Sequence, residues 1–249
     1  MTELTNRQQN ILLAIVKHYI KTAQPVGSRW LAESHSWGCS PATIRNDMSL
    51  LEELRYIFQP FTSAGRVPLD HGYRFFVDAQ LQQLSAKNET NELLSSLMDK
   101  QAYDSWDDLL QELCLKLSHQ LQSNVVIATV DNQVYSAGLQ YLLQNPEFRE
   151  TEHILPLIRL IEDNRQMFSF LQNLEFQAQK QVVLLIGKEH FWGSFAPYTT
   201  VAGYFSNPSQ RGWVTVFGPT RMHYSRNIAT LSQLTTELSA LETLFIEEI

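Results

Sequence analysis

The sequence predicts an α+β protein in two parts, and three observations support this. Helical apolar periodicity fills most of the first 80 residues and ends in two short extended segments around a small-residue loop. A polar stretch over residues 85–105 then interrupts the pattern. The remainder mixes amphipathic helices with β-branched apolar runs, which is typical of an antiparallel sheet with helices packed on it. We therefore expect domains at 1–80 and 107–249, joined by a linker at 81–106.

The composition is that of a globular chain with a real core. Of the 249 residues, 44% are hydrophobic and 18% charged. No apolar run approaches the ~18–20 residues that span a bilayer, and the N-terminus lacks the apolar region of a secretory signal. We expect a cytoplasmic protein without a membrane partner. Cys39 and Cys114 show no metal-ligand spacing and are expected to be free thiols.

The charge is distributed unevenly along the chain. The net charge of −7 opposes DNA binding, which requires Lys and Arg to neutralise phosphates. Residues 1–80, however, hold eight Lys/Arg against seven Asp/Glu, a net +1. The other 169 residues hold eleven against nineteen, a net −8. A nearly neutral first domain can present a basic face if its acids lie elsewhere.

The first two helices are predicted from caps and periodicity. Residues 5–22 begin with Thr5 as N-cap, and Gln8 completes a capping box. Residues 28–35 form a shorter helix, with Ser28 as its cap. The residues expected to pack inward from this second helix are Trp30 and Leu31.

The third helix has the clearest boundaries. Gly38 supplies a positive φ in the preceding turn, Ser40 is the N-cap and Pro41 occupies the first helical position. Apolar residues recur at helical spacing and define one buried stripe, namely Ile44, Met48, Leu51 and Leu54. That stripe leaves four hydrogen-bonding residues on exposed faces, namely Thr43, Arg45, Asn46 and Ser49.

Two extended segments follow this helix. Residues 56–60 and Val67–Pro68 flank the polar loop 62–66, and both prolines are acceptable at a sheet edge. Asp70 then begins a helix that runs to Leu84. The order of three helices, hairpin and helix predicts a winged helix-turn-helix.

A helix-turn-helix reads DNA with the N-terminal end of its second helix in the major groove. Arg45 suits the O6 and N7 atoms of guanine, and Asn46 suits the N6 and N7 atoms of adenine. Arg66 in the wing could enter a minor groove or contact a phosphate. Further candidates for DNA contact are Ser28, Arg29, Ser40, Thr43, Ser49, Thr62, Ser63, Tyr73 and Arg74. Two competing interpretations stay open: Arg45 and Asn46 are ordinary solvated residues on a helix face, or Arg45 instead pairs with Ser49, Glu52 or Glu53.

The second part predicts helices and strands but no catalytic site. The expected strands are 125–130, 182–186, 198–204 and 213–217, and the expected helices are 107–121, 151–162 and 224–249. It contains no nucleophile, metal-ligand or nucleotide-binding motif, so we expect neither an enzyme nor a cofactor or metal. Four scattered histidines are interpreted as structural, and the aromatic cluster at 191–198 either fills the core or lines a pocket.

Several segments resemble one known family. LTNRQQNILLAIVKHYI, PVGSRWLAE, SPATIRNDMSLLEEL and TSAGRVPLDHGYRFFVD are similar to the N-terminal domain of the heat-inducible transcription repressor family HrcA, over residues 4–78. GLQYLLQNPEF and FGPTRMHYSR resemble its C-terminal domain. The resemblance implies a dimer that represses chaperone operons at an inverted repeat and depends on the chaperonin GroEL. It also implies a DNA-reading helix at 40–54, a wing at 61–68 and a GAF-like second domain.

The chain departs from the family pattern in its middle. After NVVIATVD it passes almost at once to NQVYSAGLQYLL, where members usually carry a long stretch that includes an inserted dimerisation domain. The apolar ridge of the last helix serves either association or packing on its own sheet; its members are Ile228, Leu231, Leu234, Leu238, Leu241 and Leu244. Two alternative functions stay open at this point: a ligand-sensing winged-helix regulator, and a protein-interaction module that no longer binds DNA.

Overall fold

The computed structural model describes residues 4–84, 103–175 and 182–241. The chain forms two compact units: the first unit comprises residues 1–87 with 221–223, and the second unit comprises residues 88–220 with 224–249. Of the linker predicted at 81–106, residues 85–102 lie outside the described residues, and 81–84 end a helix. No helix in the described ranges is long and apolar enough to cross a membrane.

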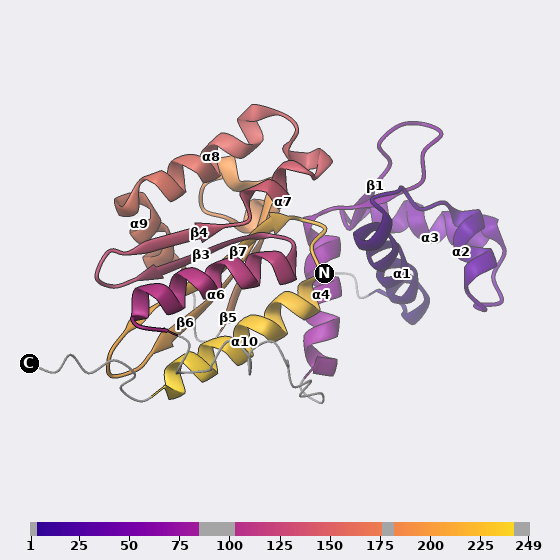
Figure 1. Ribbon diagram of the computed structural model, residues 1–249. Coiled ribbons are helices and arrows are strands. Elements are labelled where there is room, and N and C mark those ends of the chain that lie inside the picture. The colour runs from indigo at the N-terminus through magenta and orange to yellow at the C-terminus, as the bar shows by residue number, and fades with distance from the viewer. Residues whose placement is uncertain (1–3, 85–102, 176–181, 242–249) are drawn as a thin grey trace, which may run out of the picture. The chain divides into compact units, whose positions relative to one another are not determined.

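The first unit has the predicted winged helix-turn-helix fold (Figure 1). Its helices are α1 (Asn6–Thr22), α2 (Ser28–Ser34), α3 (Pro41–Glu53) and α4 (Asp70–Leu84). The wing strands β1 (Ile57–Phe58) and β2 (Val67–Pro68) pair antiparallel, with Phe58 opposite Val67. The capping box between Thr5 and Gln8 is present as predicted, since each side chain bonds the other residue's backbone N–H.

The core of the first unit is mainly aliphatic. Apolar side chains of α1, α2, α3, α4 and β1 are almost completely buried, among them Ile11, Leu12, Ile15, Val16, Leu31, Ile44, Met48, Leu51, Ile57, Tyr73 and Val77. Two expectations for α2 were wrong. Gly27 is the N-cap, and Ser28 is the first helical residue with a buried side chain. Trp30 is 37% exposed, because neighbouring positions on a short helix point about 100° apart and Leu31 takes the inward one.

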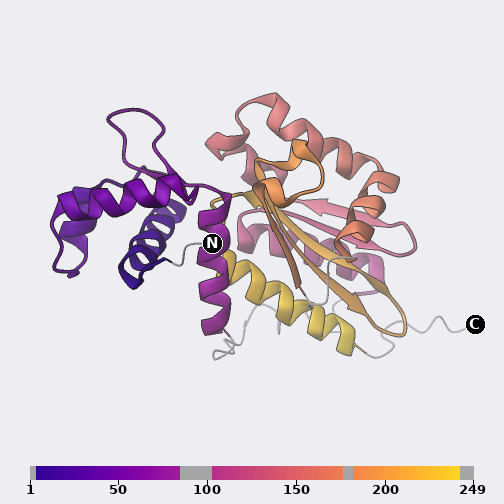
Figure 2. The same ribbon diagram turned by 180° about the vertical axis from the view of Figure 1, so that it is seen from behind.

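The second unit is built on a five-stranded antiparallel sheet in the order β4-β3-β7-β6-β5. The strands are β3 (Asn124–Thr129), β4 (Val134–Ala137), β5 (Val182–Ile186), β6 (Tyr198–Ser206) and β7 (Arg211–Pro219). One face is covered by α6 (Trp106–Leu121) and α10 (Tyr224–Ala240). The other is covered by α7 (Leu139–Leu143), α8 (Thr151–Glu162) and α9 (Asn164–Glu175), as Figures 1 and 2 show.

The structure confirms the antiparallel sheet and adds elements that were not predicted. Strand β4 escaped prediction because its four residues are mostly half-buried and show little alternation. The helices α7 and α9 were also missed. The predicted last helix ends at Ala240, and residues 242–249, including Leu244, lie outside the described part. The ridge residues Leu231, Leu234 and Leu238 are fully buried, and α10 packs on its own sheet.

Aromatic rings fill the layer between the sheet and α8–α9. The ring of Phe170 lies 5.5 Å from the rings of Trp192 and Phe195, measured between centroids. Phe195 and Tyr198 are almost completely buried, whereas Phe191 is 38% exposed. The residues of the 191–198 cluster are therefore mainly core residues, one of the two roles left open from the sequence.

Candidate nucleic-acid interface

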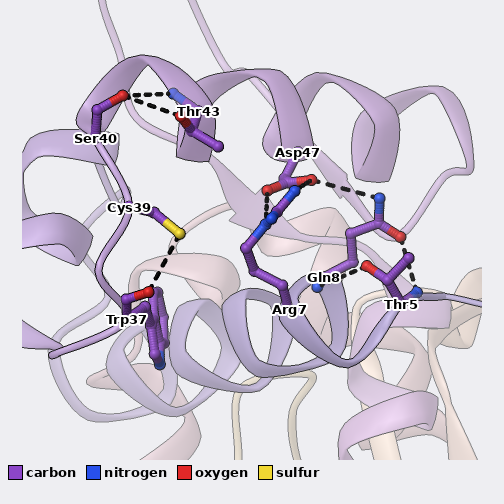
Figure 3. Close-up of polar contacts among 8 residues, drawn as sticks. All are labelled: Thr5, Arg7, Gln8, Trp37, Cys39, Ser40, Thr43 and Asp47. Carbon is purple, nitrogen blue, oxygen red and sulfur yellow. Dashed lines mark hydrogen bonds and ion pairs between the residues drawn. The ribbon is translucent and has the colours of Figure 1, made fainter.

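The turn before α3 and the first turn of α3 are locally determined. Gly38 has φ +64°, the left-handed conformation that favours glycine. The Ser40 hydroxyl accepts a hydrogen bond from the Thr43 backbone N–H at 3.1 Å and bonds the Thr43 hydroxyl at 3.0 Å (Figure 3). Of the two hydroxyls predicted to contact DNA, that of Ser40 thus caps α3 and that of Thr43 bonds the cap. This end of the helix also favours an anion through its peptide dipoles.

Helix α3 has a buried face and an exposed polar face. Ile44, Met48 and Leu51 are at most 3% exposed, as the stripe predicted, and Leu54 is half-buried. Arg45, Asn46 and Ser49 are exposed, and Thr43 is half-buried. The Ser49 hydroxyl donates to the backbone carbonyl of Arg45 at 3.1 Å, so this hydrogen bond does not involve the guanidinium of Arg45. Among the described residues, no acid pairs with Arg45.

A buried carboxylate joins α3 to α1, and the sequence analysis missed it. Asp47 is 6% exposed and accepts from Arg7 Nε at 2.7 Å, Arg7 Nη2 at 3.3 Å and Gln8 Nε2 at 3.4 Å (Figure 3). Hydrogen bonding and charge from Asp47 raise the pKa of Arg7 above its usual value. The available signal was an acid on the apolar stripe, three residues after Ile44. These bonds set the position of α3 against α1.

A second carboxylate joins α3 to the wing. Glu52 Oε1 accepts from the backbone N–H of Gln59 at 2.8 Å, and Oε2 lies 2.9 Å from Arg66 Nε. The Arg66 contact is an ion pair without the alignment of a hydrogen bond. Arg66 leaves only 13% of its side chain exposed, so it does not project from the wing as the sequence suggested. Glu52 is occupied by the wing and does not pair with Arg45.

The backbone of the wing is tied to the loop before α2. Arg66 and Val26 exchange two backbone hydrogen bonds, of 2.8 and 2.9 Å. A Cβ at Gly65 would lie 2.4 Å from the Val26 carbonyl carbon, so only glycine fits this approach. The wing and the helix-turn-helix therefore form one braced unit.

The remaining candidates divide by exposure. Arg29 on α2 and Thr62 and Ser63 on the wing loop are exposed. Ser28 and Tyr73 are buried, at 8% and 2% exposed, and present no surface to DNA. Arg74 is half-buried on α4 and lies 3.8 Å from Asp78, one helical turn away. The structure thus brings together on the surface the candidates of α3 but withdraws Ser28, Tyr73 and most of Arg66.

This arrangement defines a winged-helix DNA-binding protein. Residues 3–76 match the family model "Winged helix-turn-helix transcription repressor, HrcA DNA-binding", and residues 72–228 match "HrcA protein C terminal domain". The chain belongs to the HrcA family of heat-inducible transcription repressors and is a DNA-binding repressor of that family.

Two relatives illustrate the match along the whole chain. The heat-inducible transcription repressor HrcA of Thermosynechococcus vestitus is 30% identical over 94% of this chain and 97% of the relative. That of Carboxydothermus hydrogenoformans is 27% identical over 96% of this chain and 98% of the relative. The latter alignment has 341 positions against 249 residues here, so at least 92 positions exist only in the relative. This agrees with the expectation of a shortened member.

A solved structure supports the fold alone. A crystal structure titled as a hypothetical protein at 2.2 Å resolution is 21% identical and superimposes with a TM-score of 0.79. It covers 95% of this chain and 98% of its own.

Proposed function

We propose that this repressor controls chaperone genes by binding an inverted-repeat operator as a homodimer in the cytoplasm. The observation that carries the proposal is the exposed face of α3 bearing Arg45 and Asn46 over a buried stripe. Such a helix presents bidentate hydrogen-bonding groups to base edges. The buried apolar stripe on its opposite face fixes the rotation of the helix, so these groups stay exposed. Family membership supports the choice of chaperone genes and the chaperonin GroEL as a protein partner.

We assign base reading to Arg45 and Asn46, and positioning on the phosphate backbone to the half-buried Thr43 and to other residues that are exposed. The positioning set is Arg29, Ser40, Thr43, Ser49, Thr62 and Ser63. Arg66 is assigned instead to holding the wing, because Glu52 pairs with it. The net charge of +1 on residues 1–80 concentrates the attraction to DNA in the first unit, whereas −8 elsewhere opposes non-specific binding.

The first experiment tests the reading residue. Arg45→Ala should weaken operator binding by about 1–3 kcal/mol and relax specificity at one base pair. Arg149→Ala is the control, since it removes the same charge from an exposed site of the second unit. If Arg45→Ala bound the operator as tightly as the wild type in a gel shift, Arg45 would not contact DNA.

The second experiment tests the operator and the dimer. Fragments of genomic DNA selected by the protein should contain two half-sites about 10 base pairs apart or a multiple of that distance, with affinity falling steeply as salt rises. Light scattering should give twice the mass of one chain. If no duplex binds in a salt-dependent way, the result favours the alternative function, a protein-interaction module that no longer binds DNA. Refolding yields with and without GroEL test the chaperonin as a partner.

A further inference from the structure

The most exposed large apolar side chain in the described residues lies on the wing. Phe61 is 62% exposed, above Leu115 and Leu143 at 52% each. It occupies the loop between β1 and β2, and the exposed residues Thr62 and Ser63 follow it. Single exposed apolar side chains are common on protein surfaces, so the inference for Phe61 rests on its place in the wing of a DNA-binding fold together with its exposure.

The loop that carries Phe61 is braced from inside. Gln59 Nε2 donates to the carbonyls of Thr62 and Ala64, both at 2.9 Å. The Ala64 N–H closes a turn by donating to the Phe61 carbonyl at 2.8 Å. Glu52 of α3 accepts a hydrogen bond from the backbone N–H of Gln59. The backbone beneath Phe61 is therefore ordered before any partner arrives, which lowers the entropy cost of binding.

The tip of the wing carries no charge. None of residues 58–65 is charged, and the next cation, Arg66, is paired with Glu52. The loop therefore has no charged side chain with which to bind a phosphate. It offers one aromatic ring and two hydroxyls, a set that suits an apolar surface bordered by hydrogen-bond acceptors.

We propose that Phe61 packs into the DNA minor groove beside each half-site, against the deoxyribose and a flexible pyrimidine–purine step. Apolar side chains wedge into such steps because these unstack most easily, and the groove walls are sugar carbons. Thr62 and Ser63 then donate to the flanking phosphates. The inference rests on the proposed function, since it places the wing beside the groove that α3 reads.

The first test measures affinity and its salt dependence on the selected operator. Phe61→Ala should weaken binding roughly ten- to a hundredfold, because it removes the apolar surface that binding buries. The slope of log affinity against log salt should stay unchanged, since no phosphate contact is lost. Arg29→Gln should lower that slope by about one, and Phe61→Leu should retain part of the affinity. Leu143→Ala, which removes an exposed apolar group from the second unit, should bind as the wild type does.

The second test couples the side chain to the DNA. Replacing the pyrimidine–purine step that flanks a half-site by a stiff AA step should weaken the wild type several-fold and leave Phe61→Ala unaffected. Equal affinity of Phe61→Ala and wild type overturns the inference, and so does equal loss on the AA duplex by both proteins. Failure of the wild type to bind any duplex overturns the proposed function instead. Because Phe61 is mostly exposed, the variant should keep the melting temperature of the wild type.

Discussion

The two units differ in where their distinctive side chains lie. The first unit has an aliphatic interior, and its distinctive residues, Arg45, Asn46 and Phe61, lie on the surface. The second unit places its distinctive residues inside, where aromatic rings join the sheet to α8 and α9. The difference indicates that surface substitutions in the first unit change binding, whereas core substitutions in the second change stability.

The units also differ in what they bury besides apolar groups. Asp47 is the only Asp, Glu, Lys or Arg in the buried set of the described residues, and it lies at the contact between α1 and α3. The second unit buries neutral groups, such as Thr199, Thr215 and Asn227. A buried carboxylate is a weak source of stability, but it demands partners in one geometry and so specifies the position of α3.

The largest contrast is expected in cysteine reactivity. Burial raises the pKa of Cys114 in the second unit to about 12, so thiolate is scarce at pH 8, and its S–H donates to the Val125 carbonyl at 3.3 Å. Cys39 in the first unit is half-buried. Ellman's reagent should therefore react with Cys39 on the order of a thousandfold faster than with Cys114, because Cys114 becomes accessible only when the second unit unfolds. Cys39→Ala should abolish the fast phase; two equally fast thiols would contradict the contrast.

Next in size is the loss of an interior ring in the second unit. Phe170 is fully buried and lies 5.5–5.8 Å, between ring centroids, from Phe191, Trp192, Phe195 and Phe217. Phe170→Ala should lower the free energy of unfolding by about 3–5 kcal/mol, since it leaves a cavity. Urea denaturation followed by tryptophan fluorescence measures this. Phe191→Ala, at a partly exposed ring, should cost about 1 kcal/mol, and equal costs would show that the layer is loosely packed.

A smaller effect is expected for the buried carboxylate of the first unit. Asp47→Ala should destabilise that unit by about 1–3 kcal/mol, because Gln8 loses its partner in the interior. Operator affinity should fall as well, since α3 is no longer held against α1. Asp47→Asn keeps an acceptor and should recover part of both. Glu53→Ala, at an exposed position of the same helix, should change stability by less than about 0.5 kcal/mol; a similar loss there would argue against a special role for Asp47.

The smallest stability change is expected at the junction of α3 and the wing. Glu52→Gln keeps an acceptor for the Gln59 N–H but weakens the pairing with Arg66, a partly exposed ion pair worth at most about 1 kcal/mol. Released Arg66 should then reach phosphate, which would steepen the salt dependence of DNA binding by about one and reduce specificity. Glu53→Gln makes the same charge change without touching the wing. If both variants gave the same salt slope, Arg66 would not be held back by Glu52.

The amino-acid sequence by itself determined the features that depend on neighbours a few residues apart. The capping box of Thr5 and Gln8, the cap at Ser40 and the positive φ of Gly38 all follow from local hydrogen bonding and backbone sterics. The buried stripe of α3 and most strands of the second unit follow from apolar periodicity. The proposed reading face, Arg45 and Asn46, could be predicted because it is the complement of that stripe.

Only the tertiary structure decided which polar groups stay free. Arg7 and Asp47 are 40 positions apart, and no local pattern links them. Arg66 and Tyr73 look like DNA contacts in the sequence, yet one pairs with Glu52 and the other is buried. Ion pairs and burial depend on distances that the chain acquires only when remote segments meet, whereas caps and periodicity are properties of one segment.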